Sequence, residues 1–125
     1  MKSFHTDKAP AAVGPYVQAL QAGNFLYISG QTPIVPETGK LVEGDIKEQT
    51  RQVFRNIEAI LEEAGYAKED VLKSTVFLTD MANFKDMNEV YAEFYGDHRP
   101  TRSAFAVRAL PLGAEVEIET ICYKE

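Results

Sequence analysis

The fold is decided by residues 45–96, which read DIKEQTRQVFRNIEAILEEAGYAKEDVLKSTVFLTDMANFKDMNEVYAEFYG. The first part of this stretch repeats apolar or small side chains with the 3.6-residue period of a helix that buries one face. These side chains are Ile46, Thr50, Val53, Phe54, Ile57, Ile60, Leu61 and Ala64. Asp45 is a suitable N-cap with Glu48 three positions later, as in a capping box, and Gly65 suits the left-handed residue after a helix. The pattern predicts a helix from about Asp45 to Ala64.

A second helix is predicted from about Met81 or Asn83 to Tyr95, between a possible cap at Asp80 and a stop at Gly96. Its apolar stripe comprises Phe84, Met87, Val90, Tyr91 and Phe94. Residues 71–79 lie between the two helices, are rich in β-branched side chains, and predict a strand. Because each helix has one polar face, we expect each to lie on a sheet rather than inside a helical bundle.

Further strands are predicted on both sides of this central stretch. Residues 16–21 and 24–29 are separated by Ala22-Gly23, as in a hairpin, and a short additional strand can lie near Ile34 or Leu41. Residues 102–108 and 115–123 follow the second helix and close the chain. This order indicates an α+β fold in which two helices cover one face of a sheet. The opposite face would then meet either water or another subunit.

Composition excludes several classes of function. The 125 residues predict a single domain, residues 1–125, and its 13 basic against 19 acidic residues give a formal charge of −6. Without a lysine or arginine block, sequence-independent nucleic-acid binding is disfavoured, because it needs clustered positive charge. A single cysteine cannot form an internal disulfide or a thiolate-rich zinc site, and His5 and His98 have no ligand-like spacing. The N-terminus lacks the apolar core of a signal peptide, so we expect a cytoplasmic protein.

Charged side chains alternate along the last two predicted strands. Glu115, Glu117 and Glu119 share one parity of the last strand, and Arg102 shares a parity with Ala104 in the strand before it. One interpretation is a solvated sheet face shared by acids and arginines. The other is a polar pocket in which an arginine grips a carboxylate with two hydrogen bonds while an acidic side chain positions water or moves a proton. The spacing alone does not decide between them.

Two turns that contain glycine and proline have two interpretations of the same kind. Residues 14–16 read GPY and residues 29–33 read SGQTP. Each is either a structural turn or a loop whose glycine N–H can approach a small anion closely. Cys122 shares the apolar parity of the last strand, and we expect it to be buried and inert.

Together these segments resemble the RidA family, also called the YjgF/YER057c/UK114 family. The similar segments are residues 9–16 (APAAVGPY), 29–33 (SGQTP), 100–104 (PTRSA) and 116–119 (VEIE), with residues 44–50 (GDIKEQT) also fitting. The likeness extends from about Ala9 to Ile121. The resemblance implies a chorismate-mutase-like fold with a mixed β-sheet and two helices on one face. It also implies a homotrimer with clefts between its subunits.

RidA-type members of this family are 2-iminobutanoate/2-iminopropanoate deaminases. They hydrolyse reactive enamine and imine acids, including 2-aminoacrylate and 2-aminocrotonate, to 2-oxo acids and ammonia without a cofactor or metal. The resemblance also leaves two alternatives open: a non-catalytic ketoacid-sensing or regulatory protein, and an RNA-acting translation inhibitor. The charge of −6 argues against direct work on RNA.

The resemblance also implies roles for particular residues. Arg102 would bind the substrate carboxylate bidentately, and Glu117 would hold or activate the attacking water. Backbone N–H groups of Gly30 and Ala104 would add hydrogen bonds to the substrate. The remaining implied residues are Tyr16 and Ser29, lining the cleft, and Asn88, contributed by the second helix of a neighbouring chain. Many relatives carry cysteine where this chain has Ala104, so a thiol at that position cannot be essential here.

Overall fold

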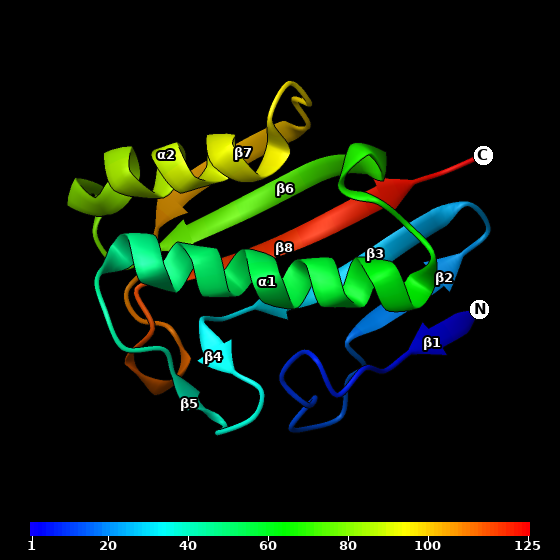
Figure 1. The fold of residues 1–125 in the computed structure, drawn as a ribbon, viewed down its shortest axis with the longest axis horizontal. Helices are drawn as coiled ribbons and strands as arrows, with labels where there is room; N and C mark the ends of the chain where they lie inside the picture. Colours follow the sequence, from blue (N-terminus) through cyan, green and yellow to red (C-terminus); the bar gives the residue numbers. More distant parts are fainter.

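One mixed sheet of six strands forms the centre of the molecule, in the order β1-β2-β3-β8-β6-β7 (Figure 1). The computed structural model describes all residues, 1–125. The strands of this sheet are β1 (Lys2–Phe4), β2 (Ala19–Ala22), β3 (Phe25–Gln31), β6 (Val71–Leu78), β7 (Thr101–Ala106) and β8 (Val116–Tyr123). Strands β6 and β7 pair in parallel, whereas every other neighbouring pair is antiparallel. A separate small ribbon joins β4 (Ile34–Val35) to β5 (Lys40–Leu41).

The two long helices begin and end close to the predicted residues. Helix α1 spans Ile46–Ala64, and the Asp45 carboxylate accepts a hydrogen bond from the Glu48 N–H at 3.1 Å. Gly65 follows α1 with a φ of 77°, the left-handed conformation that glycine adopts without strain. Helix α2 spans Phe84–Tyr95 after the single 3₁₀ turn η2 (Met81–Asn83). Two more 3₁₀ turns, η1 (Lys68–Asp70) and η3 (Pro111–Gly113), precede β6 and β8.

Both helices lie on the same face of the sheet, and the core fills the space between them and the strands (Figure 1). The alternation predicted for the last strand is confirmed, since Val116, Ile118 and Cys122 are buried beneath the helices. Burying an aliphatic side chain of this size contributes about 1.5–3 kcal/mol relative to leaving it in water. Neither helix is both long and apolar enough to cross a membrane.

The other face of the sheet has no helix over it and carries aromatic side chains. Phe105 is 46% exposed and Tyr27 47% exposed. Phe77 packs edge-on against Phe105 at 5.3 Å between ring centroids. Strand pairing places the following apolar residues on this face, which we call the helix-free face: Leu20, Phe25, Tyr27, Phe77, Phe105, Ile121 and Tyr123. An exposed apolar patch of this kind is typical of a protein–protein contact surface.

The strand predictions need three corrections. The segment predicted as a strand from residue 16 enters the sheet only at Ala19, although the Gln18 carbonyl just before it already accepts from the Ser29 N–H of β3 at 2.9 Å. Strand β1 was not expected, because its three residues are too short to show a period, and it is held by pairing of Ser3 with Leu20. The predicted hairpin is confirmed, but its turn is Gly23-Asn24 rather than Ala22-Gly23, because Ala22 pairs with Phe25. The short strands near Ile34 and Leu41 are also confirmed.

Candidate active site

A β-bulge in β3 creates the centre of the candidate site. The register between β3 and β8 shifts between the pairs Ile28–Thr120 and Gln31–Ile118, so Ser29 and Gly30 stand together opposite one residue of β8. A bulge of this kind bends the strand and redirects side chains, and bulges are common next to active sites.

Gly30 lies directly against the Glu117 side chain. A Cβ atom placed on Gly30 would lie 3.0 Å from Cδ and 3.2 Å from Cγ of Glu117, and closer still to Oε2. Both distances are shorter than ordinary van der Waals contacts, so a side chain at position 30 would displace the Glu117 carboxylate. Glycine at this position therefore lets Glu117 occupy the space beside the bulge.

Glu117 is half-buried on the helix-free face, where it pairs with Phe77 of β6. Burial raises the pKa of this carboxyl, and the charge of Glu119 two residues along the strand raises it further. A carboxylate whose pKa is raised is a stronger base than an ordinary one, as suits a group that takes a proton from water and returns it.

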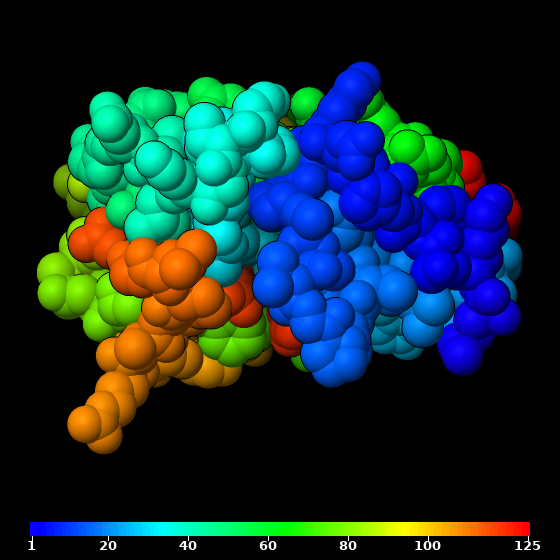
Figure 2. All heavy atoms as spheres, turned by 90° about the horizontal axis from the view of Figure 1, so that it is seen from below, coloured from blue at the N-terminus to red at the C-terminus, as the bar shows by residue number.

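A cavity of about 610 Å³ opens beside the bulge and brings four of the predicted site residues together: Tyr16, Ser29, Gly30 and Glu117. We call these four residues the Glu117 group. Figure 2 shows the N-terminal loop, in blue, and the loop before β8, in orange, on either side of a hollow in which β8 is visible. The other lining residues are Pro10, Ala11, Val13, Gln18, Gln31, Thr32, Ile34, Pro111 and Leu112.

Gln18 holds the N-terminal loop in place beside this cavity. Its side chain is 2% exposed, its Oε1 accepts from the Thr6 N–H at 2.7 Å, and its Nε2 donates to the Pro10 carbonyl at 2.8 Å. Next to it, the Ser29 hydroxyl donates to the Val17 carbonyl at 2.6 Å. The role of Gln18 was not predicted from the sequence, where its only signal is a polar residue within an otherwise apolar segment.

Buried amide side chains on α1 fix the loop that follows the bulge. Asn56 is completely buried, and its Nδ2 donates to the carbonyls of Thr32 at 3.1 Å and Ile34 at 2.9 Å. Gln52 in turn donates to the Asn56 Oδ1 at 2.9 Å. The helix therefore ties down the chain immediately after Gly30.

Gln49, one turn earlier on α1, fixes the start of β8. Its Oε1 accepts from the Glu115 N–H at 2.9 Å, and its Nε2 donates to the Glu115 carboxylate at 3.2 Å. Because Glu115 lies two residues before Glu117, this contact sets where the strand that carries the site carboxylate begins. The roles of Gln49 and Asn56 were not predicted from the sequence, since only their burial among apolar neighbours distinguishes these residues.

Arg102 lies in a different place, against helix α2. Its guanidinium is 4.7 Å from the centroid of the Tyr91 ring and 5.4 Å from that of Phe84, and its Nη1 donates to Asn88 Oδ1 at 2.6 Å. These three contacts come from positions 84, 88 and 91, which lie on one side of a helix. Helix α2 thus holds the guanidinium by one hydrogen bond and two aromatic rings.

The structure corrects one interpretation of the strand pattern. Arg102 pairs with Ser74 of β6, and Ser74 pairs with Thr120, so Arg102 lies on the helix-covered face. Glu117 lies on the helix-free face. The interpretation in which acids and arginines share one solvated sheet face is therefore wrong, because the two strands present these residues to opposite sides.

Within one chain, the predicted site residues form two separate groups. The second group, which we call the Arg102 group, consists of Asn88, Arg102 and Ala104. Asn88 contacts Arg102 of its own chain, and Ala104 is half-buried two residues further along β7. Strand β7 is the outermost strand, so one side of its backbone carries N–H and C=O groups that no neighbouring strand of this sheet pairs.

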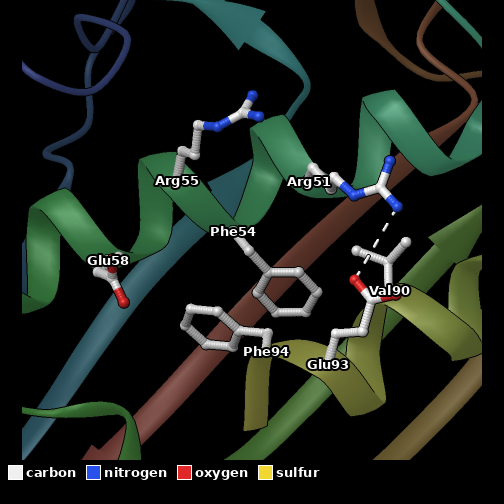
Figure 3. A pocket seen from close by; sticks show the side chains of 7 residues that line it. All are labelled: Arg51, Phe54, Arg55, Glu58, Val90, Glu93 and Phe94. Atoms are coloured by element: carbon white, nitrogen blue, oxygen red, sulfur yellow. Dashed lines mark ion pairs between the residues drawn. The ribbon is translucent and has the colours of Figure 1, made fainter.

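A smaller cavity of about 240 Å³ lies between α1 and α2 and contains none of the predicted site residues (Figure 3). Phe54 and Phe94 stack at its base with ring centroids 4.4 Å apart. Arg51 is paired with Glu48 on its own helix and with Glu93 on α2 at 3.9 Å. The cavity is a groove between packed helices with charged side chains at its rim, of which Arg51 and Glu93 are paired.

Cys122 is completely buried, as predicted. Burial raises the pKa of its thiol to about 12. At neutral pH the sulfur is therefore protonated, and the thiol is a poor nucleophile.

Comparison with known proteins places this architecture in a family. The model of the family described as "Endoribonuclease L-PSP" matches residues 6–124. A RutC family protein of Pyrococcus horikoshii is 58% identical over 120 residues, covering 96% of this chain and 95% of the relative. The 2-iminobutanoate/2-iminopropanoate deaminase of Mus musculus is 45% identical, covering 96% of this chain and 89% of the relative.

A solved structure shares the whole fold. The crystal structure of Escherichia coli TdcF with bound serine superposes with a TM-score of 0.95 at 40% identity, covering 100% of both chains. The match of the family model to almost the entire chain and the named relatives agree with the motifs in the sequence. The chain therefore belongs to the RidA (YjgF/YER057c/UK114) family.

Proposed function

We propose that this protein hydrolyses reactive 2-imino acids, including 2-iminopropanoate and 2-iminobutanoate and their enamine forms 2-aminoacrylate and 2-aminocrotonate, to 2-oxo acids and ammonia. The observation that carries the proposal is the Glu117 carboxyl, which is half-buried at a cavity, raised in pKa and packed against a glycine at a β-bulge. The names of the mouse relative and of other deaminase relatives support the same activity.

We also propose that the chain forms a chorismate-mutase-like homotrimer in which the helix-free faces meet. The exposed aromatic side chains of that face support this arrangement, because association would remove them from water. A trimer also accounts for the separation of the two groups. In this arrangement each cleft combines the Arg102 group of one chain with the Glu117 group of its neighbour.

The proposed reaction needs only orientation and proton transfer. The free N–H groups of Arg102 and the backbone N–H groups of Gly30 and Ala104 hold the substrate carboxylate, while Tyr16 and Ser29 line the cleft. Glu117 takes a proton from the attacking water while the water oxygen bonds to the imine carbon, and Glu117 then gives this proton to the imine nitrogen. The product of this step is a carbinolamine. Glu117 next transfers the proton of the carbinolamine hydroxyl group to the amino nitrogen, the C–N bond breaks, and the products are ammonia and a 2-oxo acid. The imine carbon is already electrophilic, so holding it in a fixed orientation beside a bound water molecule is sufficient to accelerate its hydrolysis.

The test is release of 2-oxo acid from freshly generated substrate. An amino-acid oxidase acting on 2-aminobutanoate produces 2-iminobutanoate, and semicarbazide traps the imine that remains. We expect wild-type protein to reduce the trapped fraction and Arg102→Ala to lose at least about 100-fold in kcat/KM, since its charged hydrogen bonds to the carboxylate are removed. No acceleration by the wild type would refute the function, and unchanged activity of Arg102→Ala would refute the assigned anchor. Tight binding of 2-oxobutanoate without any turnover would identify a ketoacid sensor instead.

A further inference from the structure

A third cavity, of about 420 Å³, lies beside α2 and is lined in part by Arg102. It is lined by Asn88, Tyr91, Ala92, Arg99, Pro100 and Arg102. The two arginines are its only charged residues, and no carboxylate lines it, although the chain as a whole has a formal charge of −6. A concave surface with two cations and no acid attracts anions, and more strongly those with two negative groups.

Arg99 is held at the rim of this hollow by the end of α2. Its Nη1 donates to the carbonyl of Gly96 and, at 3.0 Å, to that of His98. A guanidinium has five N–H donors, so these two contacts, which share one nitrogen, leave other donors of Arg99 without a partner in the chain. An arginine that is already positioned loses less side-chain entropy when it binds an anion than a freely moving one.

Arg102, which also lines the hollow, is held in a comparable way. Asn88 occupies one donor at Nη1, and the Tyr91 and Phe84 rings lie against the guanidinium. None of these contacts neutralises the charge of Arg102, because an amide oxygen and two aromatic rings carry no net charge. Two positioned cations therefore line one cavity without a bound counterion from the protein.

We propose that Arg99 is a specificity-determining residue that binds the side-chain carboxylate of 2-imino dicarboxylic acids, such as 2-iminosuccinate and 2-iminoglutarate. This inference rests on the proposed function, because it assigns the C1 carboxylate of the same substrate to Arg102. The two carboxylates of such an acid are separated by a short carbon chain, and the two arginines are three residues apart on one segment. The protein would therefore hydrolyse dicarboxylic imines in addition to the short uncharged ones.

Arg99 also has a purely structural explanation that makes a different prediction. A cation at the C-terminus of a helix interacts favourably with the negative end of the helix dipole. If this were its only role, removing the charge would change kcat/KM by the same factor for dicarboxylic and monocarboxylic substrates, or would change it for neither. The comparison of two substrates with one variant therefore separates the two roles.

The experiment measures kcat/KM for 2-iminoglutarate and 2-iminobutanoate with wild-type protein and with Arg99→Gln. We expect the ratio of the two values, dicarboxylic over monocarboxylic, to fall about 10-fold in Arg99→Gln, as expected for loss of one partly exposed charged hydrogen bond. Arg55→Gln on α1 is the matched control: it makes the same charge change outside this hollow and should leave the ratio unchanged. An unchanged ratio in Arg99→Gln, or an equal fall in Arg55→Gln, would overturn the proposal.

Binding of the products distinguishes this inference from the proposed function. 2-Oxoglutarate and 2-oxobutanoate are titrated into each protein, and affinity is followed by NMR chemical shifts, with no turnover required. We expect Arg99→Gln to weaken the affinity for 2-oxoglutarate about 10-fold more than the affinity for 2-oxobutanoate. If this difference in affinity is found but the protein hydrolyses no imine, the binding role of Arg99 is supported and the proposed deaminase activity is refuted. Equal weakening of both ligands in an active enzyme would refute the subsite alone.

Discussion

At the scale of single residues, the glycine at position 30 and the lack of a neighbouring cation explain the environment of the Glu117 carboxyl. The glycine leaves room for the acid, and burial without a neighbouring cation raises the pKa of the acid above its ordinary value of 4.5. The raised pKa means that the folded chain retains this proton at pH values at which the unfolded chain has released it. Stability contributed by this group is therefore greatest at low pH and falls as pH rises from the ordinary pKa through the raised one.

The first prediction concerns Glu117→Gln. We expect kcat for imine hydrolysis to fall at least about 100-fold, because the general base is removed. At pH 7 we expect the Tm of the variant to be higher than that of the wild type, because glutamine carries no buried charge. At a pH below 4.5, where the wild-type carboxyl is also neutral, the difference in Tm should shrink. Thermal unfolding followed by circular dichroism at the two pH values provides the measurement.

The pH dependence of catalysis provides the control for this prediction. Activity of the wild type should fall on the acidic side with an apparent pKa above 4.5, since the ionised form of Glu117 is the active one. A Glu117→Gln variant that is less stable than the wild type at pH 7, or that retains full activity, contradicts the role given to this residue.

At the scale of elements, helix α1 contributes no residue to the Glu117 group but fixes the backbone segments next to it. Its buried amides Gln49 and Asn56 bind the backbone on either side of the Glu117 group, one before β8 and one after the bulge in β3. The polar atoms are buried, but they are hydrogen-bonded, which makes their burial tolerable. Helix α2 performs the corresponding task for Arg102.

The second prediction concerns Asn56→Ala. The substitution leaves the carbonyls of Thr32 and Ile34 without their donor and opens a small cavity, so we expect a loss of about 2–4 kcal/mol in the free energy of unfolding. Asn24→Ala in the exposed β2–β3 turn is the matched control and should change stability by less than about 0.5 kcal/mol. Urea denaturation measures both. Equal effects of the two substitutions would show that Asn56 does not hold the loop.

The helices and strands could be predicted from the sequence, but the positions of the Arg102 group and the Glu117 group on opposite faces of the sheet could not. Helical periodicity and the caps at Asp45 and Gly65 predicted α1 to within one residue, because those signals are local. The parity of β8 predicted which side chains are buried for the same reason. The faces of Arg102 and Glu117 could not be compared, since that requires knowing that β6 lies between β7 and β8. Gln18 and Asn56 could not be predicted because the backbone groups that their side chains bind are 8 to 24 residues away in sequence.

For the whole molecule, two features favour the proposed homotrimer: the exposed helix-free face and the separation of the Arg102 group from the Glu117 group. A face that exposes several aromatic rings is expected to associate, and two half-sites on opposite faces of one sheet can meet only between different chains. Association is therefore part of the proposed catalytic site and not only a source of stability.

The third prediction concerns Phe105→Glu, which places a charge on the helix-free face where Phe105 is 46% exposed. Because a buried unpaired charge is strongly unfavourable, we expect the trimer to dissociate and activity to fall together with the trimeric fraction. Met81→Glu is the matched control, since Met81 is 44% exposed on η2, away from this face. Light scattering after size-exclusion chromatography gives the mass. A fully active monomer, or a wild-type protein that is itself monomeric, would contradict the assembly.

The most direct test of the central claim is complementation between two inactive variants. Arg102→Ala and Glu117→Gln, each expected to lose at least about 100-fold in activity alone, are mixed in equal amounts, unfolded and refolded together. If every cleft takes Arg102 from one chain and Glu117 from the next, random assembly leaves about one cleft in four with both wild-type residues. The account therefore predicts recovery of about a quarter of wild-type deaminase activity in the mixture. Mixed trimers that remain as inactive as the separate variants would contradict a site shared between chains.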